Sequence, residues 1–203
     1  MKKTIKIKNL ITIGVYSTVY FLATGLAQLL SSIVIPGLSS IFVPAIAALL
    51  SGTVYILLCH RVQMFGGITT MGVMMSLFFI VSGHFILAFI PSMLFALLAD
   101  WIASKGDYIS RKLNVISFTA FSFGLIGPIL PLWFIPGMYE ASLIERGKDA
   151  DYINRLFAPI NSTTFVLSMG VTLICGIAGA IIGYHLYDKH FSKLNERHVH
   201  QAS

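Results

Sequence analysis

NLITIGVYSTVYFLATGLAQLLSSIVIPGLSSIFVPAIAALLSGTVYILLCH, from Asn9 to His60, is a run of 52 residues without Asp, Glu, Lys or Arg. Three more charge-free stretches follow, over residues 62–99, 113–139 and 156–187. A helix that rises about 1.5 Å per residue needs roughly 20 apolar residues to cross about 30 Å of hydrocarbon. The first two stretches can each hold two crossings and the last two one each, so we expect an all-α bundle of six transmembrane helices.

The composition agrees with a membrane protein. Of the 203 residues, 56% are hydrophobic and 11% are charged. We therefore expect a single integral membrane domain over residues 1–203, with no room for a separate soluble domain. The first apolar segment is too long for the apolar region of a signal peptide, so we interpret it as a retained first span.

Helix-breaking residues mark the turns between the spans. Pro36 and Gly37 lie within the serine-rich segment 31–40, Ser82-Gly83-His84 forms a short hairpin, and two prolines follow Gly127 in the segment 127–131. We expect a kink or an early helix end at that last segment. The expected spans are residues 10–30, 41–59, 65–81, 86–102, 114–135 and 162–187.

The basic residues predict the orientation. The segments on the side of the N-terminus hold 11 of the 14 Lys and Arg residues, whereas the opposite side holds only Arg146, Lys148 and Arg155. By the positive-inside rule both termini are cytoplasmic, in a multi-pass protein of a prokaryotic plasma membrane. The net charge of +6 then reflects topology and contact with anionic membrane lipid, and predicts no nucleic-acid partner.

One connection is long. Residues 138–161 form an external segment with several charges, beside connections that are otherwise short. A segment of this length can be a lid over a binding site or a solvated loop, and part of it, residues 139–157, has the apolar spacing of a short amphipathic helix.

Five sequence fragments, in order, carry a family resemblance. They are Leu10-Ile11-Thr12-Ile13-Gly14, Phe65-Gly66-Gly67-Ile68-Thr69-Thr70-Met71-Gly72, Ser82-Gly83-His84, Leu97-Leu98-Ala99-Asp100 and Gly127-Pro128-Ile129-Leu130-Pro131-Leu132-Trp133. From about Ile7 to Phe191 the chain resembles the MptD-type Trep_Strep family of candidate substrate-binding (S) components of energy-coupling factor (ECF) transporters.

The resemblance implies a function in uptake. The protein would capture a small micronutrient, such as a vitamin, a vitamin precursor or a tetrapyrrole like haem, in a pocket open to the outside. Its partners would be a transmembrane coupling protein and two cytoplasmic ATPases. The sequence itself has no GxxxxGK[ST] phosphate loop, so any ATP hydrolysis must come from a partner.

The resemblance also implies a docking face of small residues on the first span, with the spacing AxxxA. Ala23 and Ala27 have that spacing, and Gly14 and Thr18 form a second such pair nearer the cytoplasm. Small residues allow helices to approach closely in lipid. They can equally pack the first span against its own bundle.

Polar and aromatic side chains at the outer ends of the later spans are the candidates for substrate binding: Ser82, His84, Trp133, Tyr139 and Asn161. His84 could contact a carboxylate or a porphyrin iron, or cap the next helix. Trp133 and Tyr139 could stack on a flat ligand or anchor the helix at the membrane interface. Asn161 could instead cap the last span. We expect His84 and Trp133 to carry most of the binding.

Other functional classes lack their signals. Paired catalytic groups such as HExxH are missing from the sequence, so we expect no enzyme, no cofactor and no metal site. Cys59 and Cys175 have no CxxC partner and are expected to pack as small apolar residues. Asp100, at the cytoplasmic end of its span, is expected to pair with Lys105 or Arg61 or to contact the coupling partner. An autonomous secondary transporter or channel remains the alternative.

Overall fold

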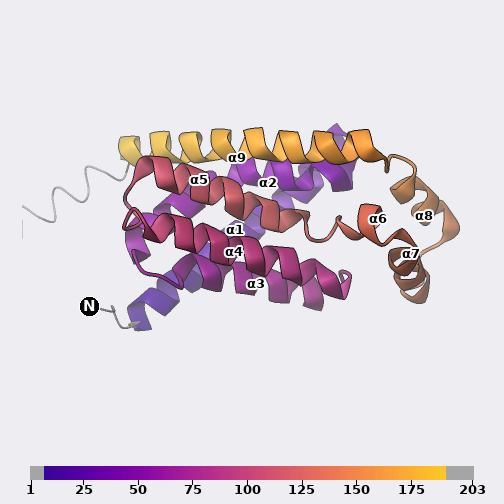
Figure 1. The fold of residues 1–203 in the computed structure, drawn as a ribbon, viewed down its shortest axis with the longest axis horizontal. Helices are drawn as coiled ribbons and strands as arrows, with labels where there is room; N and C mark the ends of the chain where they lie inside the picture. Colours follow the sequence, from indigo (N-terminus) through magenta and orange to yellow (C-terminus); the bar gives the residue numbers. More distant parts are fainter. Residues whose placement is uncertain (1–6, 191–203) are drawn as a thin grey trace, which may run out of the picture.

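The computed structural model describes residues 7–190, and all of its regular elements are helical. Three of the helices are long and apolar enough to cross a membrane: α1 (Ile7–Val34), α2 (Ser39–Val62) and α9 (Ser162–His190). Two shorter apolar helices, α3 (Gly67–Val81) and α4 (Phe89–Ser104), lie alongside them in Figure 1. These elements make the chain a helical membrane protein.

The remaining helices are short. They are η1 (Ile86–Ala88), α5 (Arg111–Ser122), η2 (Phe123–Ile126), α6 (Pro131–Phe134), α7 (Pro136–Glu145) and α8 (Ala150–Phe157). Figure 1 shows α5 within the bundle and α6, α7 and α8 gathered at the end opposite the start of α1 and the end of α9. We call this the cavity end, and the other the basic end, where Lys8, Arg61, Lys105, Arg111, Lys112 and Lys189 lie.

Helix α2 packs against both α1 and α9. Its contact with α9 depends on glycine, because a Cβ atom on Gly52 would lie 2.0 Å from the carbonyl oxygen of Gly179. A Cβ on Gly179 would in turn lie 2.2 Å from the carbonyl oxygen of Ala48. Small residues at a helix crossing bring the two backbones close enough for dense packing in lipid. The glycine-rich sequence of the last span therefore reflects this crossing.

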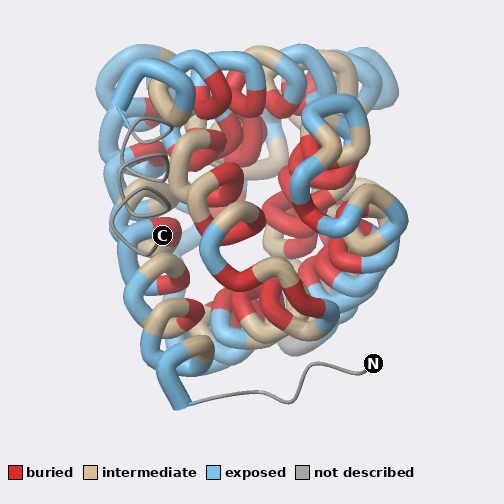
Figure 2. Tube along the Cα trace, turned by 90° about the vertical axis from the view of Figure 1, so that its left-hand side faces the viewer, coloured by how far each residue is buried: buried red, intermediate tan, exposed pale blue. Residues whose placement is uncertain are grey.

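The outer surface of the bundle is apolar. In Figure 2 the buried positions face inward and the exposed positions face outward along the helices. On α1, Ile11, Leu22 and Ile33 are 63%, 61% and 76% exposed, and on α9 Ile174 is 65% exposed. A soluble monomer rarely exposes so many large apolar side chains on neighbouring turns, whereas lipid tails cover such a surface at no cost.

Most helix boundaries lie within a few residues of the expected ones. The early helix end expected at residues 127–131 is present, since α5 stops at Ser122 and the 3-10 turn η2 stops at Ile126, so this helix is shorter than the expected range 114–135. Pro128 and Pro131 follow, and each lacks an amide hydrogen for a continuing helix. Of the alternatives for the segment 138–161, the open solvated loop is wrong and the helical one is confirmed, because most of the segment belongs to α7 and α8.

Asp100 is fully buried and accepts hydrogen bonds at the basic end. Its Oδ2 atom accepts from the backbone amides of Gly66 and Thr69, each at 2.9 Å, and from the hydroxyl of Thr69 at 2.7 Å. Its Oδ1 atom accepts from the hydroxyl of Tyr108 at 2.7 Å. The carboxylate thus satisfies amides at the start of α3 that have no partner within the helix.

The expected pairing of Asp100 with Lys105 or Arg61 is therefore wrong. The ammonium group of Lys105 lies over the ring of Trp101, 3.7 Å from its centroid. The hydrogen bonds of Asp100 link two of the quoted sequence fragments, 65–72 and 97–100. Gly66 is suited to this contact because its φ of +100° is one that other residues rarely adopt.

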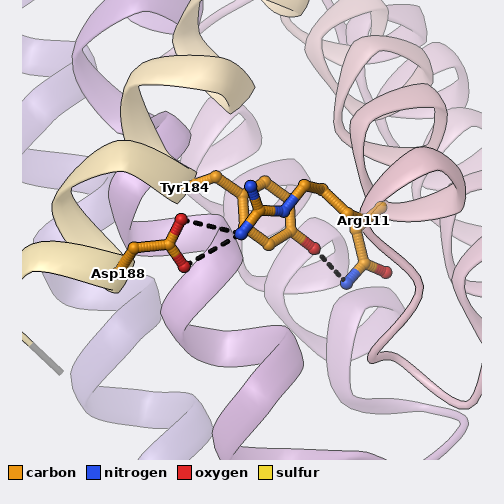
Figure 3. Close-up of polar contacts among 4 residues, drawn as sticks. Arg111, Tyr184 and Asp188 are labelled. Carbon is orange, nitrogen blue, oxygen red and sulfur yellow. Dashed lines mark hydrogen bonds and ion pairs between the residues drawn. The ribbon is translucent and has the colours of Figure 1, made fainter. Parts of the chain in front are cut away.

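A second polar contact joins α5 to α9 at the basic end (Figure 3). The guanidinium group of Arg111 donates to both carboxylate oxygens of Asp188, at 2.9 and 2.7 Å, and lies over the ring of Tyr184. The Tyr184 hydroxyl accepts from the amide of Asn114 at 2.9 Å. The ion pair is 61% and 46% exposed, so it contributes only about 0.2–1 kcal/mol to stability.

Candidate functional site

A cavity of about 470 Å³ opens at the cavity end. Its walls come from α1, α2, α3, the loop after α3 and the segment from η2 to α8. The lining residues are Phe21, Thr24, Gly25, Gln28, Ser40, Val43, Phe78, Phe79, His84, Leu125, Pro128, Ile129, Leu132, Tyr139, Tyr152 and Leu156. This volume suits a small organic molecule.

The lining is aromatic and uncharged. None of these residues is Asp, Glu, Lys or Arg, and five are Phe or Tyr. The rings of Phe21 and Phe78 pack edge to face with centroids 4.1 Å apart. Hydrogen-bonding capacity comes from Thr24, Gln28 and Ser40 on the side of α1 and α2. Such a wall can stack on a flat ligand and orient it with a few neutral hydrogen bonds.

The two segments that border the cavity contact each other. Arg146, which follows α7, donates from its guanidinium group to the carbonyl oxygen of Gly83 in the loop after α3. Nearby, the rings of Phe85 and Tyr139 pack edge to face with centroids 5.8 Å apart. The α7–α8 segment therefore contacts the α3–η1 loop beside the cavity. In this position it can cover a molecule bound in the cavity.

His84 lies on the cavity wall, with its ring centroid 5.3 Å from that of Phe79. Desolvation by the surrounding protein, to which the charge of Arg146 adds, holds the pKa of His84 below its ordinary value of 6.5. The imidazole is then neutral at pH 7 and offers one donor and one acceptor. Within residues 7–190, no group of three His, Cys, Asp or Glu side chains is placed to hold a metal ion.

The structure brings only two of the five candidate binding residues to the cavity, His84 and Tyr139. Burial raises the pKa of Tyr139, so its hydroxyl stays protonated and can donate. Trp133 is directed elsewhere: its indole donates to the backbone oxygen of Asn161 at 3.0 Å and packs on Phe165. Asn161 accepts from the amide of Thr164 at 2.9 Å, the geometry of a helix cap for α9.

Ser82, the fifth candidate, is exposed at the end of α3 and does not line the cavity. Its backbone amide donates to the carbonyl oxygen of Phe78 at 2.8 Å, so Ser82 ends the helix. The loop that contains it contributes to the cavity through His84 instead.

The sequence comparison assigns the chain to a family. Residues 7–193 match a family described as hypothetical bacterial integral membrane proteins, Trep_Strep. The chain belongs to the Trep_Strep family. The match includes every helix of the bundle, together with all of the cavity lining. No curated protein and no solved structure matches this Trep_Strep protein.

The largest part of the Trep_Strep cavity that sequence reasoning missed is on α1. Phe21, Thr24, Gly25 and Gln28 all line it, and their spacing of three and four residues puts them on one helix face. The sequence signal was present, because Thr24 and Gln28 are polar positions inside an otherwise apolar span. The cavity thus differs from a pocket built on the outer ends of the later spans alone: α4 and α9 contribute no lining residue, and α1 to α3 contribute many.

The proposed docking residues of the Trep_Strep protein fall on different faces of α1. Gly14 and Thr18 are accessible, and a Cβ atom on Gly14 would meet no heavy atom within 4 Å. Ala23 is half-buried and Ala27 is fully buried in the bundle. In this conformation Ala27 packs inside its own chain and cannot contact a partner, whereas Gly14 and Thr18 can.

Proposed function

We propose that this Trep_Strep protein is the substrate-binding S component of an ECF importer that captures a small micronutrient. The observation that carries the proposal is the uncharged, aromatic cavity at one end of a membrane bundle. The membership of an integral membrane family supports a transport role. An S component binds substrate and leaves ATP hydrolysis to its partners, in keeping with a sequence that lacks a phosphate loop.

The lining favours a flat, aromatic ligand with few charges. A ligand carboxylate inside the cavity would find no lysine or arginine on the walls, so its desolvation would be uncompensated. A heteroaromatic vitamin or vitamin precursor fits this chemistry best. A tetrapyrrole such as haem requires in addition that its carboxylates reach water at the mouth and that His84 approach the iron.

The energy source provides the main test. Affinity purification from native membranes should recover a coupling protein and two ATPases with the tagged chain, and uptake in a reconstituted system should require ATP. Uptake by the isolated chain, with no such partners, would instead indicate an autonomous secondary transporter or channel. Native mass spectrometry of the purified protein should identify the retained ligand, and a Soret band would identify it as haem.

The proposed topology has six crossings with both termini in the cytoplasm. In addition to α1, α2 and α9, the crossings would be α3, α4, and α5 with η2. The six basic residues that define the basic end support a cytoplasmic position for that end, against three at the cavity end. Lys2, Lys3, Lys6, Lys193 and Arg197 belong to the same expectation but lie outside the described residues.

The orientation predicts which sites an impermeant thiol reagent can reach. A cysteine that replaces Lys148 should react in intact cells, and one that replaces Lys105 should react only after permeabilisation. Both would be introduced after Cys59 and Cys175 are replaced by Ser, because Cys175 is only partly buried. The reverse pattern of labelling would put the cavity on the cytoplasmic side and would contradict uptake by capture from outside.

Ligand binding should depend on His84. We expect His84→Ala to weaken binding at pH 7.5 about tenfold or more, the size of effect that the loss of one main polar contact to a ligand typically has. Because the pKa of His84 is lowered, affinity should stay constant from pH 8 to about 6.5 and fall at lower pH, where protonation puts a second cation beside Arg146. His84→Gln, which keeps a neutral hydrogen-bonding group, should remove that fall.

The matched control is Trp133→Ala. Trp133 is as close to this end of the bundle but does not line the cavity, so its replacement should change affinity less than about threefold. Isothermal titration of the detergent-solubilised variants measures both effects. If His84→Ala binds as the wild type does, or if the fall at low pH persists in His84→Gln, His84 does not contact the ligand.

A further inference from the structure

The basic end carries a second cavity, separate from the first. Its volume is about 400 Å³, and it lies along the first turns of α1 beside the last turn of α2. Six of the lining residues belong to α1 (Lys8, Asn9, Ile11, Thr12, Val15 and Tyr16) and the seventh is Arg61. We call it the α1–Arg61 groove.

The polar groups of this groove are hydrogen-bond donors. Lys8 and Arg61 are exposed cations, and among residues 7–190 neither forms an ion pair or a side-chain hydrogen bond. The amide of Asn9 donates to the sulfur of Met64 at 3.2 Å, a weak acceptor, and has a second N–H to offer. None of the described residues that line the groove is a carboxylate. An anion with several acceptor oxygens, such as a phosphate group, satisfies such a set of donors.

Among residues 7–190, no carboxylate at the basic end forms an ion pair with Lys8 or Arg61. Asp100 is fully buried and accepts four hydrogen bonds, Asp188 pairs with Arg111, and Asp107, in the loop after α4, is exposed without an ion pair to either groove cation. The positive charge of the groove is therefore available to a ligand.

The other part of the groove is apolar and faces outward. Ile11 and Val15 are 63% and 57% exposed, and they follow Lys8 along α1 toward the middle of the bundle. From Lys8 to Tyr16 the groove extends about 12 Å along the helix, at about 1.5 Å per residue. Donors at the end of a membrane helix, continued by an exposed apolar wall toward its middle, match the headgroup and the first part of the acyl chain of a phospholipid.

We propose that the α1–Arg61 groove binds an anionic phospholipid, with the phosphate at Lys8, Asn9 and Arg61 and an acyl chain along Ile11 and Val15. Basic pockets at the cytoplasmic side of membrane helices bind anionic headgroups in this way, and each nearby cation strengthens binding about fivefold. The inference is independent of the transported ligand, because the groove shares no residue with the first cavity.

Native mass spectrometry of the full chain, released from nanodiscs with equal amounts of phosphatidylglycerol and phosphatidylcholine, tests the proposal. We expect the wild type to retain phosphatidylglycerol roughly tenfold more than phosphatidylcholine, and Lys8→Gln/Arg61→Gln to reduce the ratio to about two or less. The control Lys148→Gln/Arg155→Gln removes the same charge at the cavity end and should leave the ratio unchanged. An unchanged ratio in the first variant, or an equal loss in both variants, would overturn the site.

Two further measurements distinguish a bound phospholipid from the other possible occupants of the groove, free phosphate and a partner protein. Millimolar inorganic phosphate should not displace the retained phosphatidylglycerol, because the acyl chain contributes to binding; displacement would show a site for free phosphate instead. Ile11→Ser/Val15→Ser should reduce the retention of both lipids. If both groove variants keep wild-type lipid retention but lose a co-purifying protein, the groove is a protein interface and the lipid proposal is wrong.

Discussion

Asp100→Ala is expected to lower the free energy of unfolding by about 3 kcal/mol or more. The carboxylate of Asp100 is fully buried, and its removal leaves four donors without their acceptor. Each buried donor that loses its partner costs about 1–3 kcal/mol. The start of α3 and the loop that carries Tyr108 would lose their common contact.

The matched variants are Asp100→Asn and Glu140→Ala. The asparagine keeps one carbonyl oxygen for the α3 amides, and its amide can donate to the Tyr108 hydroxyl, so we expect a smaller loss of about 1–2 kcal/mol. Glu140 is exposed on α7, and its replacement should change stability by less than about 0.5 kcal/mol. Circular dichroism during thermal unfolding in detergent measures the series. Equal stability of Asp100→Ala and Glu140→Ala would show that the carboxylate does not hold these elements together.

The helix boundaries could be predicted because their signals are local. Glycine and proline between apolar stretches favour turns, and Pro36-Gly37 and Ser82-Gly83 do lie between helices. The helix end before Pro128 was also expected from the sequence, but the contact made there was not. Gly127 sits where a Cβ atom would lie 2.2 Å from the carbonyl oxygen of Ala88, a contact between segments that are distant in sequence.

The candidate site depends even more on contacts between segments that are distant in sequence. His84 and Tyr139 were found because loops at the outer ends of helices are good candidates for binding. Trp133 was also expected to contact the ligand, but its side chain contacts Asn161 and Phe165 instead. The direction of a side chain follows from how α6 packs on α9, and periodicity within α6 carries no information about that.

The hydrogen-bond partners of Asp100 could not be predicted from the sequence either. A carboxylate close in sequence to Lys105 suggested an ion pair at the cytoplasmic end of this helix. The Oδ2 atom of Asp100 instead accepts hydrogen bonds from the amides of Gly66 and Thr69, 34 and 31 residues away in sequence. The two fragments that suggested the family are thus in contact, a relation that only the folded chain reveals.

Gly25→Trp is expected to abolish binding of the transported ligand without unfolding the protein. Gly25 lines the first cavity on α1, and a Cβ atom there would meet no heavy atom within 4 Å. The indole would therefore extend into the cavity of about 470 Å³ and exclude the ligand. We expect a loss of affinity of roughly a hundredfold or more, or about 2.7 kcal/mol, in a titration of the purified variant.

Gly14→Trp is the matched control on the same helix. It inserts the same side chain at a glycine that also has no heavy atom within 4 Å of its Cβ position, but Gly14 is not part of the cavity. Its affinity for the ligand should stay within about threefold of the wild type. If Gly14 and Thr18 form the docking face, however, the indole should block the close approach of a partner helix and abolish ATP-dependent uptake.

The pair of variants separates capture from coupling. Loss of binding in Gly25→Trp alone, with loss of uptake in both, is the result expected of an S component whose ligand site and docking face lie at opposite ends of α1. Wild-type binding in Gly25→Trp would show that the first cavity is not the ligand site. Wild-type uptake in Gly14→Trp would move the docking face away from Gly14, and would leave the cavity as the binding site because the two measurements depend on different surfaces of one helix.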